Sequence, residues 1–182
     1  MISLMDLERL KYPIGTFSFS KQKNESRINE WISDIEYLPK RIENLVKDLS
    51  TEELNFAYRP KGWKIKQVIH HLADSHMNAF IRFKLSLTED SPTIKPYDEV
   101  KWAELEDGTS DDINDSLQLL NGIHSKWVKL LKTFKDDDFQ RVYVHPEHNK
   151  PFELIEALAM YAWHSNHHLA HVKQALNFKG NF

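Results

Sequence analysis

Hydrophobic periodicity constrains this chain more than any other feature of its sequence. Four stretches place apolar residues three and four positions apart, which is the spacing of one buried face on an α-helix. They cover residues 24–49, 63–88, 113–134 and 153–177. Five glycines and seven prolines in 182 residues are modest numbers, which favour helices over a β-sandwich. The pattern predicts an all-α fold that occupies residues 1–182 as a single domain.

The connections between these stretches predict how the helices are arranged. Residues 89–110 form a long link between the second and third helices, in which Trp102 and Leu105 are expected to anchor the chain on the core. The link between the third and fourth helices is expected to hold one short extended piece at residues 141–144. Four amphipathic helices with a long crossover between the second and third predict a four-helix bundle. Long connections are often functional, and residues 89–97 are expected to shape the mouth of a site.

Charge and cysteine content exclude several classes of protein. The 24 basic and 27 acidic residues give a formal net charge of −3 and are interspersed, which argues against a nucleic-acid partner. The absence of cysteine removes disulfides, thiolate nucleophiles and iron–sulfur clusters. No apolar run approaches the roughly 20 residues that span a bilayer, and charged residues interrupt the first ten positions, where a signal peptide would be apolar. We therefore expect a cytoplasmic protein with no membrane or nucleic-acid partner.

Histidine is unusually frequent, with ten in the chain and four within residues 164–171. Two pairs are four positions apart, His164 with His168 and His167 with His171. That spacing places both imidazoles of a pair on one helix face, where they can chelate one metal ion. At about 100° per residue, His164 and His168 lie at the edge of the apolar face, where a site between helices would form. His167 and His171 lie farther round and are expected at the surface or in support of the ligands.

A pair of histidines needs a third ligand, and the sequence offers several. His71 lies in a polar lane of the second helix together with Asn78 and Arg82, which are candidates for contacting a substrate. His76 falls on the apolar stripe of the same helix, and His124 takes an inward position on the third helix. Spacing alone leaves these three histidines open as the third ligand. It also leaves open that each of them is a hydrogen-bonded core residue.

Several blocks of the sequence resemble one known family. They cover residues 12–15, 58–63, 67–78, 82–85, 87–90, 92–97, 102–105 and 161–171. Across most of its length the chain is similar to the DinB superfamily of metal-binding four-helix bundles, and most similar to its YfiT-like branch. The resemblance implies that His71, which stands directly before Leu-Ala-Asp, binds the metal together with His164 and His168. One position departs from the family pattern, because Lys64 stands where Thr or Ser often begins the second helix.

The resemblance also implies an activity and an assembly. It implies one zinc or nickel ion per chain, a homodimer, and a metal-dependent hydrolase that acts on a small-molecule substrate. Related members look like S-transferases that use a low-molecular-weight thiol such as bacillithiol. The resemblance therefore implies thiol transfer as a second reaction, with bacillithiol as co-substrate.

The proposed ligands set the chemistry that is open to the site. Three neutral imidazoles leave free positions on a metal ion, where water or a thiol would bind with a lowered pKa. Zincin peptidases place Glu directly after the first His of the pair, but Ser165 follows His164, so that class is not expected. Asp74 and Glu156 are the nearest carboxylates by spacing and are expected to be solvated or to support the ligands. The polar lane beside His71 would hold an acidic thiol, and a non-catalytic metal-binding bundle is the alternative to an enzyme.

Overall fold

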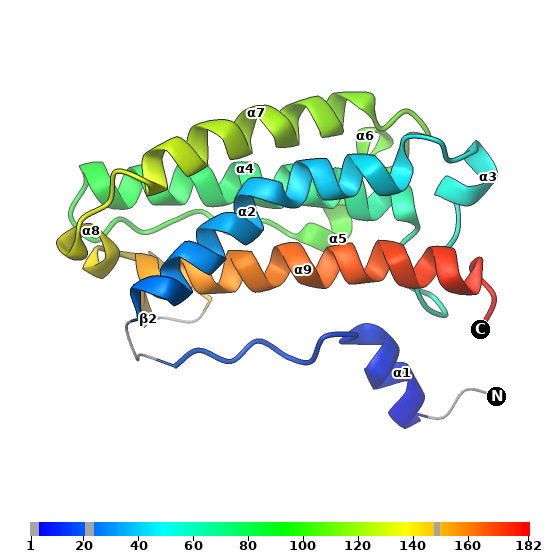
Figure 1. Cartoon of the computed structure of the whole chain (residues 1–182), viewed down its shortest axis with the longest axis horizontal. Helices are drawn as coiled ribbons and strands as arrows, with labels where there is room; N and C mark the ends of the chain where they lie inside the picture. The colour runs from blue at the N-terminus through cyan, green and yellow to red at the C-terminus, as the bar shows by residue number, and fades with distance from the viewer. Residues whose placement is uncertain (1–3, 21–23, 148–149) are drawn as a thin grey trace.

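Four long helices form a bundle, as the periodicity predicts (Figure 1). The computed structural model describes residues 4–20, 24–147 and 150–182. The four helices are α2 (Glu25–Val46), α4 (Ile65–Thr88), α7 (Asn114–Leu131) and α9 (Leu154–Phe178). None of the helices within the described residues has an apolar stretch that would reach across a lipid bilayer.

The order of the helices around the bundle follows from their packing. Helix α2 packs against α7 and α9, and α4 packs against the same two helices, so α2 and α4 lie diagonally across the bundle. Figure 1 shows that α2 and α9 run in one direction and that α4 and α7 run in the other. Neighbouring helices joined by short loops are antiparallel, so the parallel pair α4 and α7 requires the long crossover.

The crossover between α4 and α7 is anchored differently from the prediction. It contains two short helices, α5 (Glu99–Trp102) and α6 (Glu106–Thr109). Leu105 is 54% exposed, so its predicted role as an anchor is wrong, whereas Ile94 and Ala103 are buried. The reason is a close approach of backbone at Gly108, where a Cβ atom would lie 2.7 Å from the Trp102 carbonyl oxygen. Of the three residues between α5 and α6, Ala103 lies against Gly108 and is buried, whereas Leu105 is left on the outside.

A two-stranded hairpin and two more short helices complete the connections. They are α3 (Thr51–Leu54), α8 (Asp136–Gln140), β1 (Val142–His145) and β2 (Lys150–Glu153). Strand β1 corresponds to the predicted extended piece, and it pairs antiparallel with β2, which was not predicted. The crossover is fixed to this hairpin, because the Ile94 amide donates to the Val144 carbonyl at 3.0 Å and the Val144 amide donates to the Pro92 carbonyl at 2.9 Å.

The start of helix α4 shows how the chain accommodates the unusual residue at its N-cap. The Lys64 side chain provides no cap and instead donates to the Asn55 side chain at 2.9 Å. The Gln67 side chain accepts from the Lys64 backbone amide at 3.1 Å, so half of a capping box remains. The departure at Lys64 therefore changes the helix end and leaves the helix register unchanged.

The apolar core is divided into two clusters, one toward each end of the bundle. One cluster contains Phe83 and Trp127, and the other contains Leu120 and Val172. On α9, residues 164–168 fall between Tyr161 of the first cluster and Leu169 of the second. The bundle therefore buries a histidine-rich layer between two apolar layers, which excludes water from above and below.

An N-terminal arm, defined here as residues 4–20, lies along α9 (Figure 1). It consists of helix α1 (Leu4–Lys11) followed by an extended segment. The Gln174 side chain donates to the Leu10 carbonyl at 2.9 Å, and the Trp163 indole donates to the Gly15 carbonyl at 3.2 Å. The arm therefore covers a side of α9 that helical periodicity alone would assign to solvent.

Candidate metal centre

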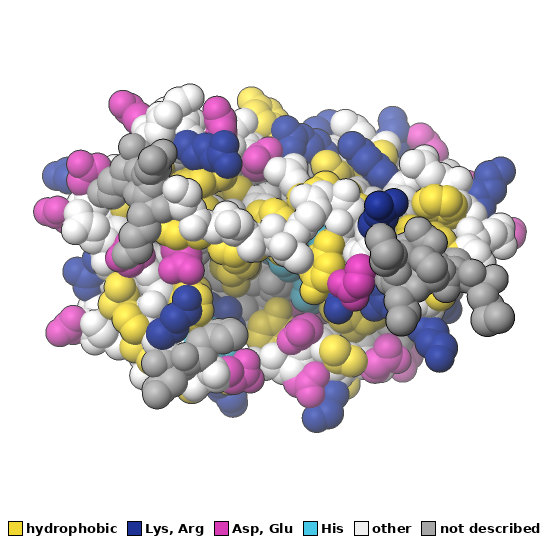
Figure 2. All heavy atoms as spheres, turned by 90° about the horizontal axis from the view of Figure 1, so that it is seen from below, with side chains coloured by type: hydrophobic (Ala, Val, Ile, Leu, Met, Phe, Trp, Pro, Cys, Tyr) yellow, Lys and Arg dark blue, Asp and Glu magenta, His cyan; other side chains and the backbone are white. Residues whose placement is uncertain are grey.

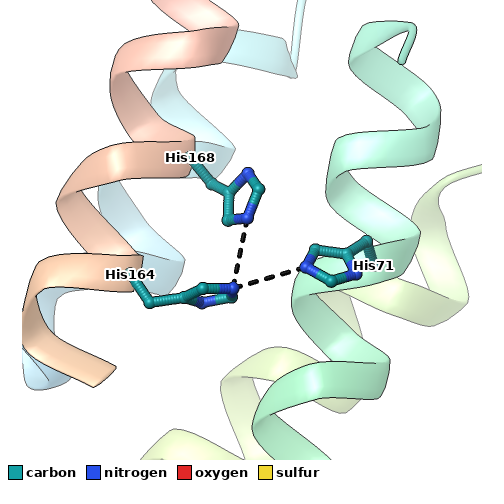
Figure 3. A group of neighbouring side chains, drawn as sticks. All are labelled: His71, His164 and His168. Atoms are coloured by element: carbon teal, nitrogen blue, oxygen red, sulfur yellow. Dashed lines mark hydrogen bonds between the residues drawn. The ribbon is translucent and has the colours of Figure 1, made fainter. Parts of the chain in front are cut away.

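Three imidazoles converge between α4 and α9. His71 projects from α4, and His164 and His168 project from successive turns of α9 toward it (Figure 3). The Nε2 atom of His164 lies 3.3 Å from that of His71 and 3.1 Å from that of His168. One ligand atom from each residue lies within 4.8 Å of the others. The structure thus brings together the three residues that were predicted as metal ligands.

The spacing of these nitrogens suits a shared ion. In a tetrahedral site with metal–nitrogen bonds of 2.0–2.1 Å, neighbouring ligand atoms lie roughly 3.3 Å apart. The two Nε2 distances from His164, 3.3 Å and 3.1 Å, agree with that value. Hydrogen bonds alone would need one proton between His164 Nε2 and each of its two neighbours. This nitrogen faces both neighbours but, in a neutral ring, has only one proton or one lone pair to offer. The three residues therefore fit a divalent ion with imidazole ligands.

Burial keeps these imidazoles in the form that binds metals. Loss of solvation lowers the pKa of His71 to about 4, with a smaller contribution from His167. The same loss of solvation lowers the pKa of His164 and that of His168 well below the usual value, and the neighbouring imidazoles add to the effect. All three rings are neutral at pH 7, which is the protonation state of a ligand.

A relay of hydrogen bonds determines which nitrogen of His164 carries the proton. The Ile35 carbonyl lies 2.6 Å from His124 Nδ1, His124 Nε2 lies 2.7 Å from His76 Nδ1, and these rings are fully buried. His76 Nε2 lies 3.0 Å from His164 Nδ1. A carbonyl can only accept, so each neutral ring donates through Nδ1 and accepts through Nε2. The lone pair of His164 Nε2 therefore points into the centre.

A second and shorter relay acts on His168. The Lys11 carbonyl of the N-terminal arm lies 3.1 Å from His171 Nε2, so that this nitrogen donates its proton. His171 Nδ1 is then the acceptor, and it lies 3.3 Å from His168 Nδ1. The proton of His168 is therefore on Nδ1, and its Nε2 lone pair also points toward the centre. Such hydrogen bonds orient metal-binding histidines and increase their basicity.

The remaining histidines take roles that helical spacing did not separate. His76 and His124, which were open as third ligands, form the relay behind His164. His171 is 1% exposed and His167 is also buried, so the surface location considered for them is wrong, while support of a ligand describes His171. The N-terminal arm causes the difference, because it covers this side of α9. No feature of the periodicity could have revealed that cover.

A cavity of about 350 Å³ opens beside the three ligands. Figure 2 shows histidine side chains at the bottom of a hollow on this face, with hydrophobic side chains beside them. Its lining includes Trp63, Trp163 and Tyr161, together with Tyr97 from the crossover. The volume lies within the usual range for small-molecule sites.

The polar candidates beside His71 divide into one that faces the cavity and one that does not. Arg82 lies in the cavity lining. Asn78 donates to the Asp74 carbonyl of its own helix at 2.9 Å and does not belong to the lining. Asp74 has its pKa raised to about 6, chiefly by burial and then by Asp107, and it does not border the cavity either. Glu156, the other candidate carboxylate, forms an ion pair with Lys150, in which its Oε1 atom lies 3.7 Å from the Nζ atom.

The fold and the site define a helical-bundle protein with a candidate metal centre of three histidines. Residues 34–172 match the sequence profile of the DinB superfamily, and the chain belongs to this family. A relative from Oceanobacillus iheyensis, named "Putative metal-dependent hydrolase", is 49% identical over 89% of this chain and 93% of its own length. "Putative metal-dependent hydrolase YfiT" of Bacillus subtilis is 43% identical over 91% and 93%.

A solved structure supports the same relationship. YfiT from Bacillus subtilis superimposes with a TM-score of 0.90 at 42% sequence identity, over 94% of this chain and 98% of that chain. Its published description is of a probable metal-dependent hydrolase with an unusual four-helix bundle topology. The parallel neighbours α4 and α7 give this chain a bundle whose topology also departs from a simple up-and-down order.

Metal content should depend on His164. We expect the metal-loaded protein to hold about one divalent ion per chain and His164→Ala to hold almost none, because two imidazoles alone bind weakly. Elemental analysis after gel filtration measures this. His70→Ala is the matched control, since His70 is a buried histidine of α4 whose nitrogens contact Ser116 Oγ at 2.8 Å and the Ser110 carbonyl at 3.0 Å. Full metal content in His164→Ala would contradict the assignment.

Metal affinity should depend on His124, although two hydrogen bonds of the relay separate this ring from the ligand His164. His124→Phe keeps the ring that stacks on His76 at 4.9 Å but removes both nitrogens of the relay. His76 can then reverse its donor and acceptor, which would place the His164 proton on Nε2. We expect affinity to fall about ten- to a hundredfold at unchanged stoichiometry, measured by competition with a chromophoric chelator. Equal affinity in the two proteins would show that the relay does not position His164.

The stability of the metal-free protein should fall in mild acid. Burial lowers the pKa of His124 to about 4 from an ordinary value of 6.5, so its contribution to stability is complete above pH 6.5 and is lost as the pH falls toward 4. At about pH 5 the loss from this one ring is roughly 2 kcal/mol. Urea unfolding with a chelator at about pH 7.5 and about pH 5 measures it. A midpoint that does not change would contradict the buried neutral state.

Proposed function

We propose that this protein is a metal-dependent hydrolase that acts on a small molecule. The observation that carries the proposal is the convergence of three neutral imidazoles, with one ring nitrogen of each within 4.8 Å of the others, beside an open cavity. The names of its relatives support the same class of reaction. Zinc and nickel both accept imidazole nitrogen, and either ion would suit this ligand set.

The residues around the centre would hold the ion and orient a substrate. When bound, the ion supplies a Lewis acid that lowers the pKa of a water or thiol in its open position. Burial raises the pKa of Tyr97 to about 12 and also raises that of Tyr161, so both hydroxyls keep their protons. They can donate hydrogen bonds to a substrate oxygen. The indole rings of Trp63 and Trp163 form apolar walls that restrict water.

A second candidate is transfer of a low-molecular-weight thiol, for which the sequence resemblance suggests bacillithiol. One observation favours it over hydrolysis. Among the described residues of the cavity lining, the carboxylates are Glu99 and Glu147, and both are exposed rather than buried beside the ligands. A metal-bound thiol needs no strong carboxylate base, because the ion itself favours the thiolate.

The homodimer and the cytoplasmic location stay predictions.

Two substrate panels separate these reactions. The zinc- or nickel-loaded protein is assayed with a set of esters and amides, and separately with bacillithiol plus an electrophile. We expect hydrolysis in the first panel, loss of that activity to background in His164→Ala, and retention in His70→Ala. The loss follows from the removal of a ligand that the control variant keeps.

The outcomes of the panels are distinct. Turnover only with thiol and electrophile would replace hydrolysis by the second candidate. Turnover in neither panel, by protein with a full metal complement, would favour the non-catalytic metal-binding bundle. Activity that is equal in wild type and His164→Ala would show that the three-histidine centre is not the active site.

A further inference from the structure

The side chain of Arg82 is buried in the cavity wall without an acidic partner. It is only 9% exposed, and its Nη1 atom lies 3.4 Å from the Tyr161 hydroxyl, which is a long contact. Among the described residues, no carboxylate forms an ion pair with this guanidinium. A buried charge without a partner of opposite sign is strongly unfavourable, so the place of Arg82 beside a cavity calls for a ligand of opposite charge.

The neighbours of Arg82 are hydroxyl groups that remain neutral. Ser75 lies in the same cavity lining, and its side chain interacts with the hydroxyls of Tyr97 and Tyr161. The pKa of each phenol is raised, mainly by burial, so neither becomes a phenolate that could neutralise the guanidinium at neutral pH. The site therefore combines one fixed positive charge with several groups able to donate hydrogen bonds.

Arg82 also shares the lining of one cavity with the metal centre. His71, Ser75 and Arg82 occupy one face of α4, since they are four and seven residues apart. Side chains on a helix lean toward its N-terminus, and for Arg82 that is the direction of Ser75 and His71. On α9, Tyr161 precedes His164 by one turn, and their rings lie 5.9 Å apart. The cationic group and the three imidazoles therefore belong to one continuous wall.

We propose that Arg82, together with the hydroxyls of Tyr97 and Tyr161, binds a carboxylate group of the substrate. The rest of the substrate extends along the wall to the three imidazoles. A planar guanidinium matches a carboxylate with two parallel hydrogen bonds. A phosphate dianion is less suitable, because a single cation and neutral hydroxyls would leave one of its charges unpaired. The ligand class is thus a small organic acid whose reactive group lies several bonds from its carboxylate.

The rim of the cavity does not contradict this assignment. Glu99 and Glu147 also line the cavity, but both are exposed to solvent, and water and salt screen their charges. Neither forms an ion pair with Arg82. They therefore weaken the attraction for an anion at the mouth more than they weaken binding at the guanidinium.

Hexanoate, hexanamide and hexyl phosphate are suitable probes of this subsite. Binding to the nickel-loaded protein is followed by chemical-shift changes and by paramagnetic relaxation of the probe protons. We expect hexanoate to bind with its terminal methyl group nearer the ion than its α-methylene group. We expect Arg82→Gln to weaken hexanoate about ten- to a hundredfold, the value of one charge-assisted pair, while Arg82→Lys keeps part of the affinity. Hexanamide should bind no better to wild type than to Arg82→Gln.

Several results would overturn the proposal. One is equal binding of hexanoate to wild type and Arg82→Gln. A second is an α-methylene group of hexanoate nearer the ion than its methyl group, which would place the carboxylate on the metal. A third is tighter binding of hexyl phosphate than of hexanoate, and a fourth is no binding of hexanoate to wild type. If Arg82→Gln does not fold, the comparison of hexanoate with hexanamide in wild type and the proton relaxation still decide.

The identity of this carboxylate as part of a substrate rests on the proposed function, but binding itself does not. Hexanoate that binds as expected to a protein inactive in both reaction panels would contradict the enzyme and leave the carboxylate subsite standing. Hydrolysis that depends on His164 but is indifferent to Arg82→Gln, with no change in hexanoate binding, would contradict the subsite and leave the enzyme standing.

Discussion

A buried ring nitrogen without a hydrogen bond is costly, and a relay of imidazoles that avoids this cost organises the middle of the bundle. The relay that begins at the Ile35 carbonyl takes one member from each long helix: α2 supplies the carbonyl, α7 His124, α4 His76 and α9 His164. Because the carbonyl can only accept, one arrangement of protons satisfies the whole chain of rings. The direction of the His164 lone pair on α9 is thus decided by the Ile35 carbonyl on α2, through the two imidazoles that lie between them in the relay.

The position of this layer between two apolar clusters makes the arrangement stable. The low local polarity strengthens each hydrogen bond of the relay and disfavours protonated rings. The same surroundings would make a broken relay costly, since an unpaired nitrogen would stay buried. The N-terminal arm contributes in the same way, because the Lys11 carbonyl fixes the proton on His171 and so the lone pair of His168. Helix packing, arm and ligand geometry are therefore coupled through the histidines.

The sequence alone predicted those features of the structure that depend on the regular spacing of residues along a single helix. Periodicity predicted the four long helices, and the spacing of four residues predicted that His164 and His168 share a face. It could not separate His71, His76 and His124, because all three point inward and differ only in which nitrogen faces which neighbour. The cover provided by the N-terminal arm, which is a contact between distant segments, was equally invisible. The burial of Ala103 and the exposure of Leu105 accompany the close backbone approach at Gly108, which is another contact that periodicity does not encode.

The ligand set also determines the charge of the candidate site. Three neutral imidazoles do not offset the charge of a divalent ion, whereas a carboxylate ligand would cancel part of it. With Arg82 in the same wall, a bound divalent ion would make the floor of the cavity cationic although the whole chain carries a net charge of −3. Such a local field in a site of low polarity attracts anions and strengthens the acidity of any group bound to the ion. Recognition of an acid and activation of a nucleophile would then both follow from one feature of the described residues, which place no carboxylate beside the three imidazoles.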